Sequence, residues 1–261
     1  MAVDPARPLL GRHAVVTGGG GGIGAASALA LARLGARLSL IGRRPEKLAA
    51  EARAIADATG AETATLSLDV TDAGAVHAAF AGLGAVDILV NNAGAAESAP
   101  FAKTGLDLLE RMLAVNLKAA FLCTQAVLPA MLAARHGRII NIASTAGLIP
   151  YAYVSAYVAS KHALIGLTRA LALETAKTGV TVNAVCPGFT DTDLVARAVE
   201  TIAAKTGRSA EAARAELAKT NPMGRLVTPQ EVASAVAYLA LPSAGAVTGQ
   251  AIVVAGGEVM P

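Results

Sequence analysis

Residues 13–34 read HAVVTGGGGGIGAASALALARL. The apolar run predicts a short strand, the five glycines a turn, and the alanine- and leucine-rich stretch a helix. This order is typical of a dinucleotide site, because glycine lets the backbone approach a pyrophosphate and a helix N-terminus offers free N–H groups. The spacing Gly18-x-x-x-Gly22-x-Gly24 is one residue longer in its first gap than Gly-x-Gly-x-x-Gly. A glycine turn that binds nothing is the alternative.

Strand and helix patterns alternate along the rest of the chain, which predicts a parallel sheet with helices on both faces. We therefore expect an α/β, Rossmann-like, doubly wound sheet of about seven strands in a single domain from residue 11 to 261. Residues 1–10 are expected to be a loose tail. Residues 190–222 are helical in composition and contain no strand pattern, so they predict a flexible helical lid. The other expected strands are 37–41, 63–68, 86–90, 139–143, 180–185 and 251–254, and the other helices are 45–59, 105–134, 155–177 and 229–241.

Composition excludes several classes of protein. A chain of 261 residues with 54% hydrophobic and 16% charged residues is globular. Net charge is +3, but no basic run is interleaved with aromatics, so we expect no nucleic-acid partner. The longest uncharged stretches, 139–160 and 232–257, are broken by Pro, Gly and polar residues, and no apolar leader is seen, so we expect no membrane span and no secretion. Two separated cysteines suit a cytoplasmic protein, and four histidines without ligand spacing predict no metal site.

The stretch 138–161 carries the candidate chemistry. A predicted strand delivers Ser144 at its end, and Tyr157 and Lys161 follow at a spacing of four residues. On a helix, that spacing places the phenol and the ammonium on one face. A free tyrosine titrates near pH ~10, and a neighbouring cation is expected to lower that pKa toward neutrality. Tyr-x-x-x-Lys alone is weak evidence, because the pair is common on ordinary helices.

Residues at other strand ends suit a bound nucleotide. The second strand ends at Arg43 with no acidic residue, and an arginine there pairs with a 2′-phosphate, which favours NADP(H) while leaving NAD(H) open. Asp69 and Val70 follow the third strand and could border the adenine, although Asp69 could simply cap the next helix. Asn116 lies inside a predicted helix, where asparagine is unfavourable, so it is a candidate for a functional distortion.

Together these motifs resemble the short-chain dehydrogenase/reductase family over about residues 12–257, with similarity to 3-oxoacyl and polyketide ketoreductases and to hydroxyacyl dehydrogenases. The resemblance rests on motifs that occur in the family's order and spacing. They are Thr17-Gly18-x-x-x-Gly22-x-Gly24, Asn91-Asn92-Ala93-Gly94, Asn116, Ser144, Tyr157-x-x-x-Lys161 and Pro187-Gly188.

The resemblance implies a role for each matching residue. Tyr157 would be the general acid or base at the carbonyl oxygen, Ser144 would polarise that oxygen, and Lys161 would bind the nicotinamide ribose and lower the Tyr157 pKa. Asn116 would hold, through its backbone, a water of a proton relay. The cofactor-binding set would further comprise Gly18, Gly22, Ile23, Gly24, Arg43, Asp69, Val70, Asn92, Pro187, Gly188, Thr190 and Thr192, together with Tyr157 and Lys161. A homodimer or homotetramer is also implied.

Three functional hypotheses remain open. The first is an NADPH-dependent ketoreductase of the 3-oxoacyl type, acting on a small carbonyl or alcohol that is either free or thioester-bound. The second is an NAD-linked catabolic dehydrogenase of a cyclic alcohol, hydroxyacid or sugar. The third is a non-catalytic NADP sensor, which the complete set of four catalytic-type residues disfavours.

Overall fold

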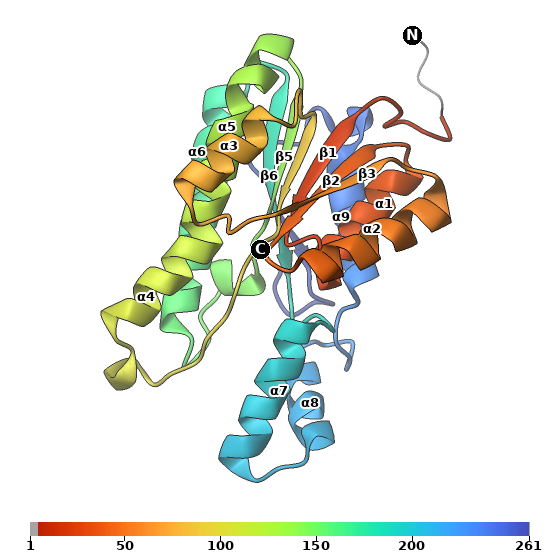
Figure 1. The fold of residues 1–261 in the computed structure, drawn as a ribbon. Coiled ribbons are helices and arrows are strands. Elements are labelled where there is room, and N and C mark those ends of the chain that lie inside the picture. The colour runs from red at the N-terminus through yellow and green to blue at the C-terminus, as the bar shows by residue number, and fades with distance from the viewer. Residues whose placement is uncertain (1–4, 261) are drawn as a thin grey trace.

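Seven parallel strands form one sheet in the computed structural model, which describes residues 5–260 (Figure 1). The strand order is β3-β2-β1-β4-β5-β6-β7. The chain adds β2 and β3 on one side of β1 and then crosses to the other side to form β4. Doubly wound sheets bind ligands at such a crossing point, outside the carboxyl ends of the strands. The strands are β1 (His13–Thr17), β2 (Arg37–Gly42), β3 (Thr63–Ser67), β4 (Ile88–Asn91), β5 (Gly137–Ile142), β6 (Val180–Pro187) and β7 (Ala251–Val254).

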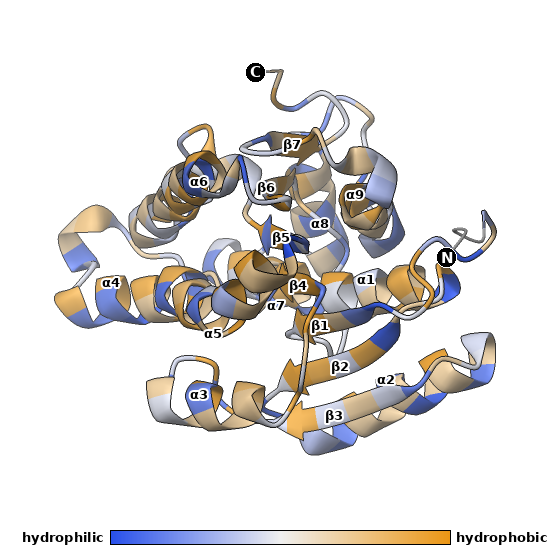
Figure 2. Cartoon of the chain, turned by 90° about the horizontal axis from the view of Figure 1, so that it is seen from above, coloured by the Kyte–Doolittle hydropathy of each residue, from blue (hydrophilic) through white to orange (hydrophobic). Residues whose placement is uncertain are grey.

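Helices cover both faces of the sheet, with α1, α2 and α9 on one side and α3, α5 and α6 on the other (Figure 2). This arrangement confirms the expected doubly wound α/β architecture. The α-helices are α1 (Gly22–Arg33), α2 (Pro45–Thr59), α3 (Ala73–Ala81), α4 (Leu106–Leu113), α5 (Ala119–Ala134), α6 (Ser155–Thr175), α7 (Asp193–Thr206), α8 (Ala210–Ala218) and α9 (Pro229–Ala240).

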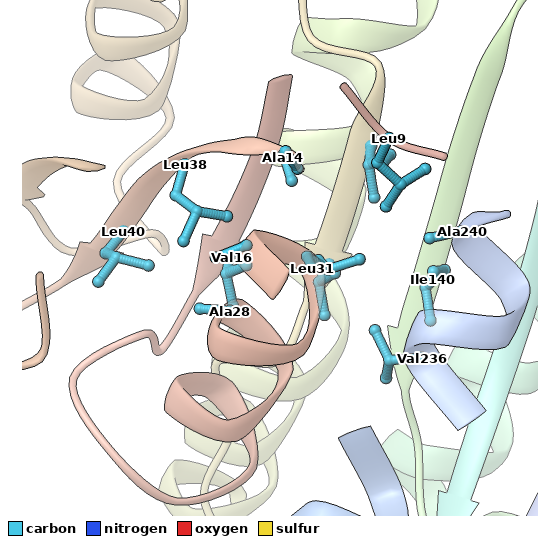
Figure 3. Packing of buried hydrophobic residues seen from close by; sticks show 14 of the residues in the cluster. Leu9, Ala14, Val16, Ala28, Leu31, Leu38, Leu40, Ile140, Val236 and Ala240 are labelled. Carbon is cyan, nitrogen blue, oxygen red and sulfur yellow. The ribbon is translucent and has the colours of Figure 1, made fainter. Parts of the chain in front are cut away.

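Strand β1 is apolar in its three central residues, and these residues pack on both faces of the sheet. Ala14 and Val16 pack toward α1 and α9 in one core cluster, whereas Val15 packs in the opposite cluster with residues of α3 and α5. All five residues of β1 are buried, and because helices cover both faces the central three show no alternation of apolar and polar residues. Figure 3 shows the first cluster, to which Leu31 of α1 and Val236 of α9 both contribute side chains.

The N-terminal segment differs from the expected loose tail of residues 1–10. Residues 1–4 lie outside the described part of the chain, but Leu9 is 1% exposed and belongs to the core cluster of Figure 3. Its backbone N–H also donates to the carbonyl of Leu34 at 2.9 Å. The prediction of a loose tail is therefore wrong at Leu9, because its side chain is buried in the core beside the end of α1.

The long helix expected over 105–134 is interrupted in its middle. Helices α4 and α5 are joined by a π-helical turn, η2 (Ala114–Lys118), which contains Asn116. By length and composition alone, Leu106–Ala134 could cross a membrane. In this fold α5 instead packs against the sheet, with Cys123, Val127 and Met131 buried against its strands.

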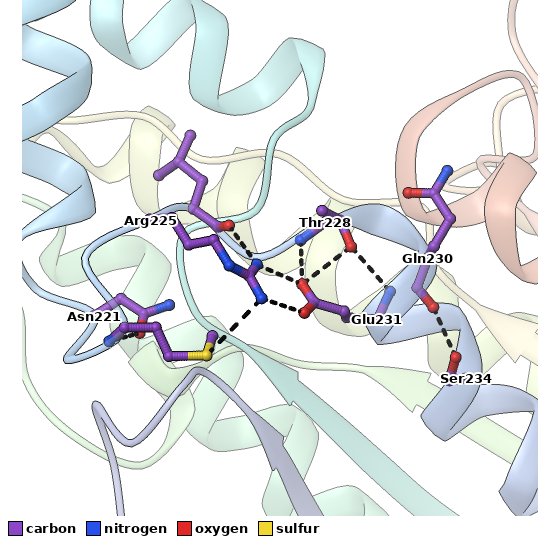
Figure 4. A network of polar contacts seen from close by, with 8 residues as sticks. Asn221, Arg225, Thr228, Gln230, Glu231 and Ser234 are labelled. Carbon is purple, nitrogen blue, oxygen red and sulfur yellow. Dashed lines mark hydrogen bonds and ion pairs between the residues drawn. The ribbon is translucent and has the colours of Figure 1, made fainter.

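Helices α7 and α8 project from the body as a separate pair (Figure 1). They enclose a small apolar cluster that includes Val195, Val199 and Ala213. Arg214 of α8 donates to both carboxylate oxygens of Asp191 at 3.0 and 2.6 Å, which ties the pair to the end of β6. The chain then returns to α9, whose first turn forms a polar network centred on Glu231 (Figure 4).

Candidate active site

The carboxyl ends of β1, β4, β5 and β6 bring the predicted residues to one edge of the sheet. Ser144 follows β5 and precedes a single 3₁₀ turn, η3 (Thr145–Gly147), whose Ala146 N–H donates to the serine hydroxyl at 3.1 Å. Tyr157 lies in the first turn of α6, and α6 packs against η3. The Ser144 hydroxyl lies near enough to the Tyr157 phenol to act on its pKa, in the lowering direction. The structure therefore brings together two groups separated by 13 residues of sequence.

Lys161 is buried one turn farther along α6. Its ammonium donates to the carbonyl of Ile142 at 2.8 Å and lies 5.7 Å from the centre of the Tyr157 ring. Burial lowers the pKa of this ammonium to about 8. The hydrogen bond to Ile142 therefore holds the ammonium at the end of β5, next to the Tyr157 ring.

The expected direction of the Tyr157 pKa is wrong for the chain without ligands. Burial raises the pKa of the Tyr157 phenol, and the hydrogen bond with Ser144 opposes this rise. The charge of Lys161 is visible in the sequence, whereas the loss of solvation around both groups appears only in the folded chain.

Asn116 links three segments through its side chain. Its Oδ1 accepts from the Ala95 N–H at 3.0 Å, and its Nδ2 donates to the Ala95 carbonyl at 2.9 Å and to the Ser160 hydroxyl at 3.1 Å. Ser160 donates to the Tyr157 carbonyl at 2.7 Å. The expected helix distortion is present as the π-turn η2, and a fully hydrogen-bonded amide holds it against α6.

The glycine loop after β1 can accept a pyrophosphate. Gly18 has a φ of 66°, and a Cβ there would lie 2.7 Å from Asn92 Nδ2, which donates to the Thr17 carbonyl at 2.9 Å. A Cβ on Gly24 would collide with the Gly18 carbonyl oxygen. Helix α1 starts at Gly22 without a side-chain cap, and Ile23 is the next residue of its first turn. Close backbone approach and uncapped helix N–H groups fit the chemistry of a dinucleotide phosphate.

The residues expected near the adenosine lie at the neighbouring strand ends. Arg43 is exposed immediately after β2, and its positive charge contributes to lowering the Asp69 pKa. The main cause of that lowering is the Thr71 backbone N–H, which donates to Asp69 Oδ1 at 2.9 Å. Val70 is buried. Helix α3 is capped by Asp72, whose side chain accepts from the Ala75 N–H, so the alternative role of Asp69 as the cap of this helix is wrong.

The loop after β6 approaches the glycine loop from the other side. Thr190 is buried and donates to the Gly188 carbonyl at 3.0 Å, and Thr192 donates to the Thr190 carbonyl at 3.2 Å. A Cβ on Gly22 would lie 3.2 Å from the Thr192 methyl group. A groove of about 590 Å³ between α1, α2 and the start of α7 includes Gly22 and Thr192, but not the catalytic-type side chains.

Two polar groupings were not predicted from the sequence. Asn91 Nδ2 donates to Asn141 Oδ1 at 2.8 Å, and Asn141 Nδ2 donates to the Thr168 hydroxyl at 2.9 Å, which bridges β4, β5 and α6 inside the core. Near the C-terminus, Glu258 accepts from the Tyr151 hydroxyl at 2.6 Å. Polar residues inside apolar strands are the only sequence signal for the first grouping, and no periodic pattern points to the second.

Comparison with known proteins agrees with this geometry. Residues 12–203 match the family model of short chain dehydrogenases. A protein described as a ketoacyl reductase of the granaticin polyketide synthase of Streptomyces violaceoruber is 43% identical over 94% of this chain and 92% of its own. D-beta-hydroxybutyrate dehydrogenase of Cupriavidus necator is 39% identical over 92% and 95%. A crystal structure of an actinorhodin polyketide ketoreductase variant with NADPH superposes with a TM-score of 0.91, at 39% identity over 95% and 97%.

A doubly wound sheet with a glycine-rich first turn defines a dinucleotide-dependent protein. The chain belongs to the short-chain dehydrogenase family. It is accordingly an oxidoreductase that acts on CH–OH groups of a small-molecule substrate and uses an NAD(P) cofactor.

Proposed function

We propose that the protein is an NADPH-dependent ketoreductase of the 3-oxoacyl type. The observation that carries the proposal is the convergence of Ser144, Tyr157 and Lys161 at the end of β5, with Asn116 anchoring the helix that bears the last two. A hydroxyl pair that can bind one carbonyl oxygen, backed by a buried amine, is suited to moving a proton to or from that oxygen.

The roles of these residues follow from where they lie. Ser144 donates a hydrogen bond to the substrate carbonyl oxygen, and Tyr157 transfers its phenolic proton to that oxygen as the alcohol forms. Bound NADPH supplies the hydride. Lys161 holds the ribose hydroxyls, and its charge favours the phenolate left on Tyr157. Asn116 keeps Tyr157 in place through Ser160, and its backbone holds a water of the proton relay that links Lys161 to solvent.

The cofactor is proposed to bind along the carboxyl ends of the strands, between the glycine loop after β1 and the loop after β6. The pyrophosphate is contacted by the glycine loop, through Gly18, Gly22, Ile23 and Gly24. Asp69, Val70 and Asn92 border the adenosine, whereas Pro187, Gly188, Thr190 and Thr192 border the nicotinamide. Arg43 binds the 2′-phosphate, since an exposed arginine at the end of β2 has the geometry to form a two-pronged hydrogen bond with it.

Two sets of relatives support different substrates. The granaticin relative is described as a ketoacyl reductase and the actinorhodin structure as a ketoreductase with NADPH, which supports the 3-oxoacyl reading. The hydroxybutyrate relative supports the alternative, an NAD-linked dehydrogenase of a hydroxyacid or cyclic alcohol.

A second copy of the chain is the proposed partner. Phe121 of α5 is 49% exposed and lines an apolar groove of about 580 Å³ together with Leu113, Leu117 and Leu167 of the adjoining helices. Apolar surface of this kind is typical of an interface. We propose a homodimer or homotetramer formed through this face, and light scattering of Phe121→Asp against the unchanged protein tests it. An unchanged mass would contradict the interface.

The catalytic proposal is tested by NADPH oxidation with acetoacetyl-CoA, run in parallel with NADH. Rapid loss of NADPH absorbance in the wild type, abolished in Tyr157→Phe, is the expected result. Turnover only with NADH would favour the catabolic dehydrogenase, and turnover that persists in Tyr157→Phe would contradict the role of the tyrosine.

A further inference from the structure

The C-terminal segment brings a carboxylate to the catalytic edge of the sheet. The Tyr151 hydroxyl donates to Glu258 Oε1 at 2.6 Å and also bonds the Thr145 hydroxyl at 2.8 Å. A phenol has one proton, so Thr145 is the donor in the second bond. Burial and the bond to Glu258 both raise the Tyr151 pKa, which keeps the phenol protonated. Thr145 directly follows Ser144, so Glu258 is two hydrogen bonds from the catalytic loop.

The second carboxylate oxygen has no compensating group. Within residues 5–260, Glu258 Oε2 is enclosed by the protein without a hydrogen-bond partner, and Glu258 forms no ion pair. A Cβ on Gly188 would lie 2.7 Å from Oε2, so the carboxylate rests against the loop that follows β6. Phe189 in that loop packs edge-on against Tyr151, with ring centres 6.0 Å apart.

An uncompensated carboxylate between these two loops repels other anions. A short 3-oxo acid carries its carboxylate two bonds from the ketone carbon. If that ketone reaches Ser144 and Tyr157, its carboxylate approaches the part of the site where Thr145, next to Ser144 in the chain, is linked through Tyr151 to Glu258. Two like charges that approach each other in a poorly solvated site weaken binding by about tenfold or more.

We propose that Glu258 is a specificity-determining residue that excludes substrates with a free carboxylate, so that the substrate class is neutral ketones, with the acid group esterified or absent. The inference rests on the proposed function, since it takes the space before Ser144 and Tyr157 as the substrate site.

The test compares kcat/KM for ethyl acetoacetate and acetoacetate, a pair that differs in the carboxylate charge. The wild type should prefer the ester by about tenfold or more, and Glu258→Gln should reduce this preference by about tenfold, through a lower KM for acetoacetate. Tyr151→Phe removes the hydrogen bond but keeps the charge, so its preference should match the wild type. Glu62→Gln makes the same charge change at an exposed position before β3 and should also leave the preference unchanged.

An ester-to-acid preference that is the same in Glu258→Gln and the wild type overturns the inference. Equal use of both substrates by the wild type overturns it as well, and this measurement stands even where the Gln variant does not fold. If neither ketone is reduced in a Tyr157-dependent way, the proposed function itself fails, and the inference fails with it.

Discussion

Asn116 and Ser160 are joined by a hydrogen bond of 3.1 Å between the π-turn and α6. Ser160 donates in turn to the carbonyl of Tyr157, while Asn116 holds both backbone polar groups of Ala95. One buried amide therefore fixes the loop after β4 and the helix turn that presents the tyrosine.

Replacing Asn116 by alanine should cost both stability and activity. The change leaves the Ala95 N–H and carbonyl without their partners, which is expected to lower the free energy of unfolding by about 2–4 kcal/mol. Asn221→Ala is the control, because Asn221 is comparably buried but its side chain makes one hydrogen bond, to the Met223 N–H. Urea unfolding and kcat measure the two effects. Equal stability losses in both variants would contradict the role of the Asn116 side chain in joining the loop after β4 to α6.

The sequence predicted the sheet well because the relevant signals are local. The central strands β1, β4, β5 and β6 are largely apolar and buried along their whole length, and the glycine unit of 13–34 marks the first crossover without any long-range information. The unusual position of Asn116 could be noticed, because an amide is unfavourable within a helix. The groups that its side chain bonds could not be predicted, because Ala95 lies 21 residues and Ser160 lies 44 residues away in the sequence.

The features that were missed depend on tertiary packing. Leu9 lies in a short segment without periodicity, so nothing local shows that it fills the core. The Tyr157 pKa follows burial, which a sequence does not display. Glu258 meets Tyr151 across 107 residues of chain, and only the folded sheet brings them together.

Gly24→Ala should destabilise the protein, because its Cβ would meet the backbone carbonyl of Gly18 and lie 2.5 Å from Asn92 Nδ2. A backbone atom cannot move away as a side-chain tip can, so a loss of about 1–3 kcal/mol or more is expected. At Gly20 the nearest heavy atom to an added Cβ is 3.3 Å away, in the side chain of Lys47. Gly20→Ala should therefore melt close to the wild type. Similar melting temperatures for the two variants would refute the close packing at Gly24.

Lys161 should make stability depend on pH in the alkaline range. Its pKa falls from 10.5 to about 8 on folding, so between these values the unfolded chain holds a proton that the folded chain has released. Stability contributed by this group therefore rises with pH through that window, by at most about 3 kcal/mol. Urea unfolding at pH 7, 8.5 and 10 should show that the free energy of unfolding of the wild type increases with pH relative to that of Lys161→Met. A constant difference would show that burial does not depress the pKa.

Arg43→Ala should weaken NADPH selectively. Loss of a charge-assisted hydrogen bond to the 2′-phosphate is expected to raise the KM for NADPH by about tenfold and leave the KM for NADH unchanged. Arg53→Ala removes the same charge from an exposed position on α2 and should affect neither cofactor. Equal weakening of NADPH and NADH by Arg43→Ala would remove the basis for the NADP preference.

Glu231 should stabilise the start of α9 above acidic pH. It accepts from the Thr228 N–H at 2.8 Å and pairs with Arg225 through bonds of 2.6 and 2.9 Å (Figure 4). The Arg225 hydrogen bonds, followed by that of Thr228, lower the Glu231 pKa to about 2. The folded chain therefore releases this proton more readily than the unfolded chain, and the resulting stability is complete above pH ~4.5 and is lost as pH falls toward 2.

A comparison of Glu231→Gln with the wild type isolates this contribution. At pH 7 the variant should lose about 0.5–1 kcal/mol, because the pair is exposed and solvent screens much of its attraction. At pH 3 the loss should be smaller, because the unfolded wild-type chain already binds a proton at Glu231 below pH ~4.5, which offsets part of the stability that the folded pair contributes. Glu216→Gln, which removes an exposed carboxylate that pairs with Lys219 at the end of α8, is the matched control for loss of a surface ion pair at pH 7. A difference between Glu231→Gln and wild type that grows on acidification would reverse the sign assigned here and exclude a depressed pKa.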